Sequence, residues 1–159
     1  MTYALQQISD YLEIRDLAAR YNRYADLADG PNYSMLYTED GEFEIVGLGV
    51  FRGRKEIAAA CEATKVTVHV TTDPLIEFDG DTARQRSRAI LFYRAPDRSK
   101  NEFVVTGWYI DELKRTPEGW RFHRRRAEMD LTIEESMRKM TVTEAFAGLS
   151  SDLGDAACG

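Results

Sequence analysis

The sequence is poor in the residue types that usually hold metals and cofactors. Its 159 residues include two cysteines, Cys61 and Cys158, and two histidines, His69 and His123. None of these four stands at the C-x-x-C or H-x-x-x-H spacing of a zinc site. The G-x-G-x-x-G and G-x-x-x-x-G-K-[ST] loops that hold nucleotide phosphates are missing, as is the G-x-S-x-G turn of a nucleophilic serine. We therefore expect neither a metal nor an organic cofactor.

Long apolar runs and an excess of basic residues are missing as well. Uncharged stretches such as 45–51 and 66–72 are much shorter than the roughly 20 residues of a membrane span. The first residues lack the basic start and apolar run of a secretory signal, so we expect a cytoplasmic protein. Lys and Arg number 21 against 27 Asp and Glu, a net charge of −6. Proteins that bind nucleic acid usually show the opposite balance, so we expect no nucleic-acid partner and no membrane partner.

The composition that remains is typical of one folded domain. Hydrophobic residues make up 43% of the chain and charged residues 30%, as in soluble globular proteins. A chain of this length has room for a single core. We expect one domain over residues 1–147, with its core within 10–130 and a frayed tail of small residues over 148–159.

Helices are expected first along the chain. Apolar residues at three- and four-residue spacing predict a long first helix: Ile14, Leu17, Ala18, Tyr21, Tyr24 and Ala25. The glycine and proline of 29–31 should end it. A short helix over 33–37, a strand over 42–46, a turn over 47–53 and a helix over 54–63 are expected to follow.

Extended segments dominate the second half. Turns at 79–81, 96–101 and 116–119 separate four predicted long strands, over 65–78, 82–93, 103–113 and 120–129. A last helix is expected at about 133–146. Helices before an antiparallel sheet predict an α+β domain in which the helices cover one face of the sheet. Long twisted strands of this kind curl into a half-open cone, with a pocket for a small ligand between sheet and helices.

Two ionisable residues are candidates for chemistry, and the local pattern leaves each ambiguous. Strand alternation groups His69 with Thr67 and Thr71, opposite three valines. A histidine among threonines either faces solvent or lies in a polar stripe on the pocket, where it would act as a general base. Asp26 lies off the apolar stripe, near a helix end whose dipole disfavours a carboxylate. The helical pattern alone favours a solvated Asp26.

Aromatic and arginine residues have similar alternatives. Tyr21 and Tyr24 belong to the apolar stripe, so they pack in the core or offer a hydroxyl to the pocket. Alternation puts Arg124 and Arg126 on one face, and His123 and Arg125 on the other. The outer arginines would pair with carboxylates of adjacent strands or form a subunit interface. The two tryptophans at 108 and 120 are expected in the core or at an interface.

Several short strings in order resemble the SnoaL-like branch of the nuclear-transport-factor-2-like superfamily. They are I-R-D-L at 14–17, Y-T-E-D-G at 37–41, F-R-G-R at 51–54, D-G-D at 79–81 and G-W-R-F at 119–122. Together they span about residues 10 to 130. The resemblance implies a cystatin-like α+β fold, a curved antiparallel sheet that forms a half-open cone covered by N-terminal helices.

Within that branch the sequence is similar to hexachlorocyclohexane dehydrochlorinase and bile acid 7α-dehydratase, cofactor-free lyases with an Asp-His pair. The resemblance implies that Asp26 and His69 are this pair and face the pocket. It also implies that Tyr21 and Arg125 polarise or protonate the leaving group. The second carboxylate of the dehydratase falls near Phe92 here, which is no acid, so that part of the chemistry does not carry over.

The resulting expectation is a lyase that performs a dehydratase- or dehydrochlorinase-like elimination. His69 would remove a proton from carbon and Asp26 would orient its imidazole. Tyr24 and Trp108 would help to bind a small hydrophobic substrate, aromatic or polycyclic. Retro-aldol cleavage or isomerisation would use the same base, and a non-catalytic ligand carrier or assembly subunit would need only the cone. We also expect a homodimer or homotrimer that forms through the outer face of the sheet.

Overall fold

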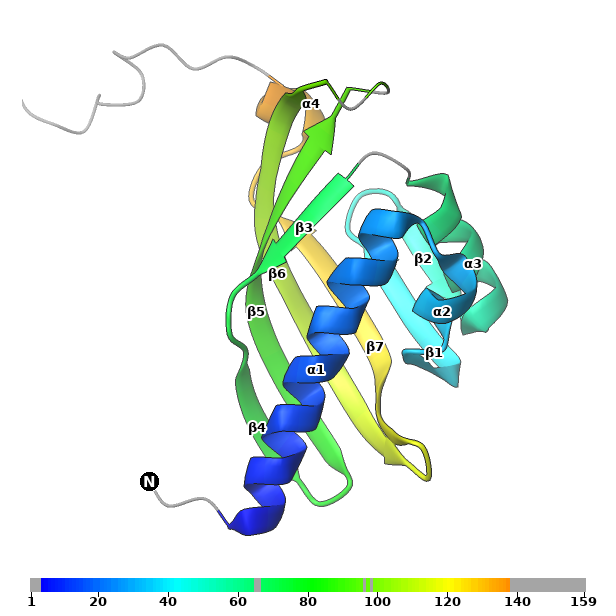
Figure 1. The fold of residues 1–159 in the computed structure, drawn as a ribbon, viewed down its shortest axis with the longest axis vertical. Coiled ribbons are helices and arrows are strands. Elements are labelled where there is room, and N and C mark those ends of the chain that lie inside the picture. The colour runs from blue at the N-terminus through cyan, green and yellow to red at the C-terminus, as the bar shows by residue number, and fades with distance from the viewer. Residues whose placement is uncertain (1–3, 65–66, 96, 98, 138–159) are drawn as a thin grey trace, which may run out of the picture.

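The computed structural model describes residues 4–64, 67–95, 97 and 99–137 (Figure 1). The chain begins with helices α1 (Leu5–Leu27) and α2 (Gly30–Ser34), strands β1 (Tyr37–Ile45) and β2 (Gly49–Arg52), and helix α3 (Gly53–Ala63). Five further strands and a short helix follow: β3 (Thr67–Thr71), β4 (Leu75–Asp79), β5 (Thr82–Arg94), β6 (Asn101–Thr116), β7 (Gly119–Met129) and α4 (Ile133–Met137). The predicted order of helices before long strands is confirmed.

The strands form one open sheet in the order β2-β1-β7-β6-β5-β3, with β4 also paired to β5. The pairing of β1 with β7 is parallel and the other pairings are antiparallel, so the sheet is mixed rather than wholly antiparallel as predicted. Helix α1 crosses one face of the curved sheet, and α2 and α3 lie beside β1 and β2 (Figure 1). The predicted α+β class, with helices over one face, is confirmed.

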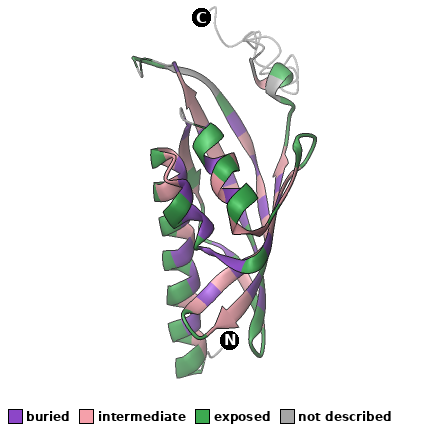
Figure 2. Ribbon diagram, turned by 90° about the vertical axis from the view of Figure 1, so that its right-hand side faces the viewer, coloured by how far each residue is buried: buried purple, intermediate pink, exposed green. Residues whose placement is uncertain are grey.

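The N-terminal helices follow the sequence pattern closely. Ile14, Leu17, Tyr21 and Ala25 of α1 are buried, and the purple stripe in Figure 2 shows this face of α1 turned toward the sheet. The short second helix occupies 30–34 rather than the predicted 33–37. Its start is set by Asp29, whose carboxylate accepts a hydrogen bond from a backbone N–H of the first turn at 3.2 Å, and proline occupies an early helical position.

The predicted strand over 65–78 is interrupted. It consists of β3 and β4, which pair with successive parts of β5. The interruption lies at 72–74, where Pro74 has no N–H to donate to a ladder. Residues 65 and 66 lie outside the described part of the chain. The break matters because it ends β3 directly after the segment that carries His69.

Strict alternation also fails in β7. Arg124 pairs with Glu112, but Phe122 pairs with Leu113, so His123 is an extra residue in the strand. Such a β-bulge changes which side chains face inward. As a result Phe122 and Arg125 are both buried, whereas His123 places Nδ1 3.2 Å from the hydroxyl of Thr38. The prediction that His123 shares a face with Arg125 is wrong for this reason.

The carboxyl end is described only as far as residue 137. Helix α4 begins at Ile133, as predicted. Residues 138–159, which include the rest of the predicted helix and the predicted tail, lie outside the described part. Among the helices of the described residues, none has the length and apolar character needed to cross a membrane.

Candidate functional site

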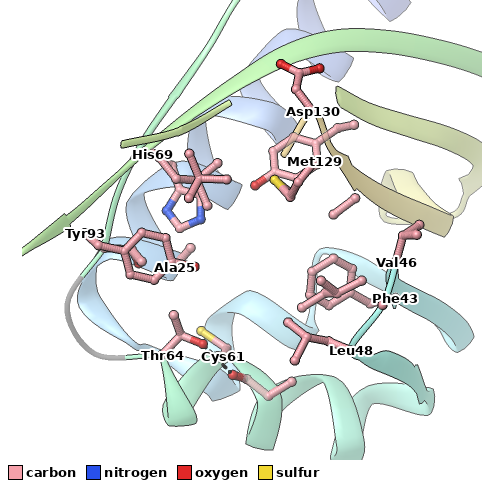
Figure 3. Close-up of a pocket in the computed structure, with 18 of the residues that line it drawn as sticks. Ala25, Phe43, Val46, Leu48, Cys61, Thr64, His69, Tyr93, Met129 and Asp130 are labelled. Atoms are coloured by element: carbon pink, nitrogen blue, oxygen red, sulfur yellow. Dashed lines mark hydrogen bonds between the residues drawn. The ribbon is translucent and has the colours of Figure 1, made fainter. Parts of the chain in front are cut away.

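A pocket of about 580 Å³ lies between the concave face of the sheet and the helices (Figure 3). This volume is in the range of small-molecule sites. Most of the wall is apolar, and it includes Phe43, Ile45, Leu91, Val105, Ala127 and Met129. Cross-strand partners form two rows of it, His69–Leu91–Val105 and Tyr109–Ala127–Ile45. No lysine or arginine of the described residues lines the pocket.

His69 and Asp26 are hydrogen-bonded. His69 Nδ1 and Asp26 Oδ1 are 2.8 Å apart, and the backbone N–H of His69 donates to the same oxygen at 2.8 Å. Because a carboxylate only accepts hydrogen bonds, Nδ1 carries a proton, and in the uncharged form of the ring the lone pair is then on Nε2. Among the described residues Nε2 has no hydrogen-bond partner. The His69 side chain is 8% exposed and lines the pocket.

Asp26 lies behind His69 and does not line the pocket itself; its side chain is 29% exposed. The helical pattern favoured a solvated carboxylate because Asp26 is beside the buried stripe and not in it. The structure places β3 along this flank of α1, so the carboxylate has a partner that the helix alone does not reveal.

Polar side chains of α1 meet the β3 region in three successive pairs. Asn22 donates to the hydroxyl of Thr71 at 2.9 Å, one helical turn before Asp26. Arg15 pairs with Asp73 at 2.7 Å. From Asn22 to Asp26 the helix rises about 6 Å, and from Thr71 to His69 the strand spans about 6.6 Å, so these two pairs fit the same spacing, whereas Arg15 reaches Asp73 from seven residues before Asn22. The position of Asp26 against His69 is therefore fixed by two regular elements rather than by a loop.

Tyr21 is the second predicted site residue that lines the pocket. Its ring is 2% exposed and stands edge-on to the imidazole of His69, with 6.0 Å between centroids. Tyr33 and Tyr109, which no sequence pattern indicated, also line the pocket, and their ring centroids lie 4.9 and 5.4 Å from that of Tyr21. Burial raises the pKa of Tyr33 and of Tyr109 well above the ordinary value, so both remain neutral phenols.

Arg125 is buried beneath these tyrosines and does not line the pocket. Its guanidinium donates two hydrogen bonds of 2.7 Å to Asp111 and lies 4.0 Å from the ring centroid of Tyr21 and 4.3 Å from that of Tyr109. Burial lowers the pKa of Arg125, but the charge and hydrogen bonds of Asp111 outweigh burial and hold it well above normal. The rings of Tyr21 and Tyr109 separate Arg125 from the pocket, so Arg125 can influence a ligand only through these tyrosines.

Neither predicted substrate-binding aromatic residue lines the pocket. Trp108 alternates with Tyr109 along β6 and so lies on the opposite face of the sheet, where the guanidinium groups of Arg86 and Arg88 stack at 4.0 and 4.6 Å. Tyr24 packs against the margin of the core, one position away from the pocket-lining Ala25. The aromatic wall of the pocket comes instead from Phe43 and the tyrosines.

Two further small polar residues line the pocket. The hydroxyl oxygen of Thr67 is buried, and the described residues offer it no hydrogen-bond partner. Cys61 is a free, buried thiol whose pKa is raised to about 12, mainly by burial, so it is a poor nucleophile. For Thr67 a sequence signal was available, because strand alternation grouped it with His69 on one face. The described residues contain no group of three His, Cys, Asp or Glu able to hold a metal.

Comparison with known proteins identifies relatives over most of the chain. The sequence model of the SnoaL-like domain family matches residues 6–126. An uncharacterized protein of Mycobacterium tuberculosis, Rv2910c, is 32% identical over 130 residues, which cover 77% of this chain and 86% of the relative.

Solved structures show the same fold. An Asp-to-Asn variant of Rv3472, a protein of unknown function from Mycobacterium tuberculosis, is 32% identical with a TM-score of 0.71, over 88% of this chain and 83% of that one. A nuclear-transport-factor-2-like protein with a cystatin-like fold from Novosphingobium aromaticivorans is 29% identical with a TM-score of 0.68, over 86% and 93%. The hexachlorocyclohexane dehydrochlorinase LinA type 2 is 17% identical with a TM-score of 0.71, over 80% and 89%, a likeness of fold alone.

Proposed function

The chain belongs to the SnoaL-like domain family, and from this premise we propose that it is a cofactor-independent lyase that acts on a small, largely apolar substrate. The proposal rests above all on one observation, the 2.8 Å contact of Asp26 with His69 Nδ1 beside a pocket that His69 lines. A histidine fixed in this tautomer has the geometry of a general base. The hexachlorocyclohexane dehydrochlorinase among the structures of this fold performs an elimination, as its name states, and lends support.

The proposed reaction is a proton abstraction from carbon. His69 Nε2 takes the proton, and the electrons of the C–H bond form a new double bond as the leaving group departs from the neighbouring carbon with its own bonding pair. Asp26 balances the positive charge that develops on the imidazole. A departing hydroxide takes up a proton, supplied through a pocket phenol and replaced by the one on His69, and leaves as water. A halide leaves as the anion, and the imidazolium of His69 then releases its proton to solvent.

The leaving group would be assisted by phenols rather than by a second carboxylate. Phe92, near which the dehydratase's carboxylate falls, alternates with the pocket-lining Leu91 and does not line the pocket. Tyr21, Tyr33 and Tyr109 do, and the raised pKa of the last two keeps them as hydrogen-bond donors. Arg125 would be a positioning residue, since it contacts Tyr21 and Tyr109 from beneath. The same base would equally serve retro-aldol cleavage or isomerisation.

The test uses the two histidines of the chain. Ring alcohols, ketones and halides are incubated with the protein in D2O, and NMR follows loss of C–H signal and release of water or halide. His69→Gln should abolish turnover, and Asp26→Asn should lower it by about 10²- to 10⁴-fold. His123→Gln is the matched control, because His123 lies outside the pocket. Turnover by His69→Gln at the wild-type rate would reject the proposal.

The second candidate is a non-catalytic ligand carrier, which is favoured by the lack of a second carboxylate at Phe92. A carrier needs the apolar wall of the pocket but not the Asp26–His69 hydrogen bond. In that case Asp26→Asn would leave ligand affinity unchanged, and no substrate class in the panel would turn over.

A further inference from the structure

We propose that Thr67 is a specificity-determining residue, and that the ligand of this pocket is a neutral ring compound that bears an oxygen, such as a phenol, alcohol or ketone. The inference deepens the proposed function and rests on it for the identity of the reacting C–H group. The hydrogen bond to Thr67 is independent of catalysis.

The hydroxyl of Thr67 is unusual in the wall to which it belongs. Thr67 is 4% exposed, its oxygen is buried, and no group of the described residues is within hydrogen-bonding reach. Buried polar groups in folded proteins nearly always have a partner. The oxygen itself has almost no accessible surface, but Thr67 lines the pocket, so rotation about its Cα–Cβ bond would present the hydroxyl to a ligand atom that supplies the partner.

The strand geometry sets the distance between this group and the base. Thr67 and His69 stand two residues apart on β3 and both line the pocket. Two residues of a strand span about 6.6 Å. A ligand that meets both would carry its oxygen roughly the length of a fused two-ring system from the C–H group that His69 attacks.

The charge of the wall restricts the ligand further. No lysine or arginine of the described residues lines the pocket, so no permanent positive charge among these residues would balance a carboxylate or phosphate. Of the acidic residues that line it, Asp130 is held by Arg88 and by the hydroxyl of Thr106. The Arg88 hydrogen bonds hold the pKa of Asp130 below its usual value. Glu135, the other acidic residue of the described lining, accepts hydrogen bonds from the N–H and hydroxyl of Thr132. The described wall therefore favours an uncharged ligand over an anion.

The experiment compares 2-naphthol with naphthalene, which differ only in the hydroxyl. Dissociation constants are measured by fluorescence for the wild type, Thr67→Val and Thr67→Ser, with melting temperatures to check folding. We expect the wild type to prefer 2-naphthol by roughly threefold to tenfold, the usual effect of one neutral hydrogen bond. Thr67→Val should remove this preference and Thr67→Ser should keep most of it, while both variants melt close to the wild type.

Four outcomes decide this inference, and the last two also separate it from the proposed function. A wild type that does not prefer 2-naphthol, whether it binds both probes equally or neither, overturns the inference, as does an unchanged preference in Thr67→Val. Turnover of an oxygen-free substrate that Thr67→Val leaves unaltered also overturns it, yet leaves the lyase standing. Loss of preference in Thr67→Val together with no turnover of any substrate supports the Thr67 contact and rejects the lyase.

Discussion

Arg125 and Asp111 form an ion pair from which solvent is excluded on every side, each residue being 1% exposed. Gln85 donates a further hydrogen bond of 2.6 Å to Asp111, and the rings of Tyr21 and Tyr109 cover the guanidinium. The pair lies directly beneath two tyrosines of the pocket wall. A change at Arg125 is therefore expected to alter both stability and the position of those rings.

Truncation of the Arg125 side chain should strongly destabilise the fold. Arg125→Ala leaves the Asp111 carboxylate buried without its counter-ion, so we expect a loss of about 3–5 kcal/mol in the free energy of unfolding. Arg124→Ala is the matched control: the Arg124 side chain is 47% exposed and pairs with Glu42 and Glu44 at the surface, which is worth less than about 1 kcal/mol. Urea denaturation measures both. Equal midpoints for the two variants would contradict the prediction.

At the scale of elements, the first half of α1 is fastened to the β6–β7 hairpin through Asp10. This carboxylate accepts two hydrogen bonds of 2.7 Å from Arg115 and one of 3.2 Å from the indole of Trp120. The hydrogen bond from Arg115 lowers the pKa of Asp10 from 3.8 to about 2, although burial opposes the change. Its folded-state pKa is therefore below its unfolded value.

This pKa predicts a pH-dependent contribution. A carboxylate with a depressed folded-state pKa stabilises the fold above pH 3.8, and the contribution is lost as the pH falls toward 2. Wild type should exceed Asp10→Asn by about 2 kcal/mol in unfolding free energy near pH 7. The difference should shrink between pH 4 and 2. Asp81→Asn serves as control, because Asp81 also pairs with Arg115 but is 82% exposed. A gap that stays constant with pH would count against the prediction.

The β6–β7 pairing also depends on a residue without a side chain. A Cβ at Gly107 would lie 2.4 Å from the carbonyl oxygen of Glu128 and 2.8 Å from Cα of Met129. Gly107→Ala should push the strands apart and cost about 1–3 kcal/mol. Thermal unfolding would show it, with the partly exposed Val104→Ala of the same strand as control. An unchanged melting temperature for Gly107→Ala would show that the strands accommodate the methyl group.

Prediction from sequence succeeded where the signal was local. The three- and four-residue spacing of Ile14, Leu17 and Tyr21 was enough to place α1 and its buried face. The break at 72–74 had a local signal in Pro74, which the prediction of one strand over 65–78 did not use. The bulge at His123 was missed because strand alternation alone does not show where the register of β7 against β6 shifts. Asp26 is the same kind of case, since its partner is 43 residues away and the resemblance, not the helical pattern, pointed to it.

At the scale of the whole molecule, helices α1, α2 and α3 cover one face of the sheet, and no helix of the described residues covers Trp108 on the other. That outer face carries Trp108 between Arg86 and Arg88. Aromatic residues and arginine are enriched in protein interfaces. We accordingly propose that this face joins two or three copies of the chain.

Light scattering at micromolar concentration tests the assembly. The wild type should have the mass of two or three chains, and Trp108→Glu should shift it toward one. Leu5→Glu is the control, an exposed leucine on α1, away from the outer face of the sheet. A wild-type mass of a single chain would refute the assembly.

The matched spacing of the α1 and β3 side-chain pairs has a consequence for how the Asp26–His69 contact is lost. A slide of α1 by one turn, about 5.4 Å, would set Asn22 in place of Asp26 opposite His69, exchanging a charged acceptor for a neutral amide. We expect positions in between to satisfy neither pair, so intermediate placements of α1 should be disfavoured. A variant that weakens the Asp26–His69 contact should then be a mixture of molecules with the contact formed and molecules in which Asn22 replaces Asp26, rather than one population with a uniformly weaker contact. Two sets of His69 ring signals in an NMR spectrum would be its signature, and a single set that shifts gradually would exclude it.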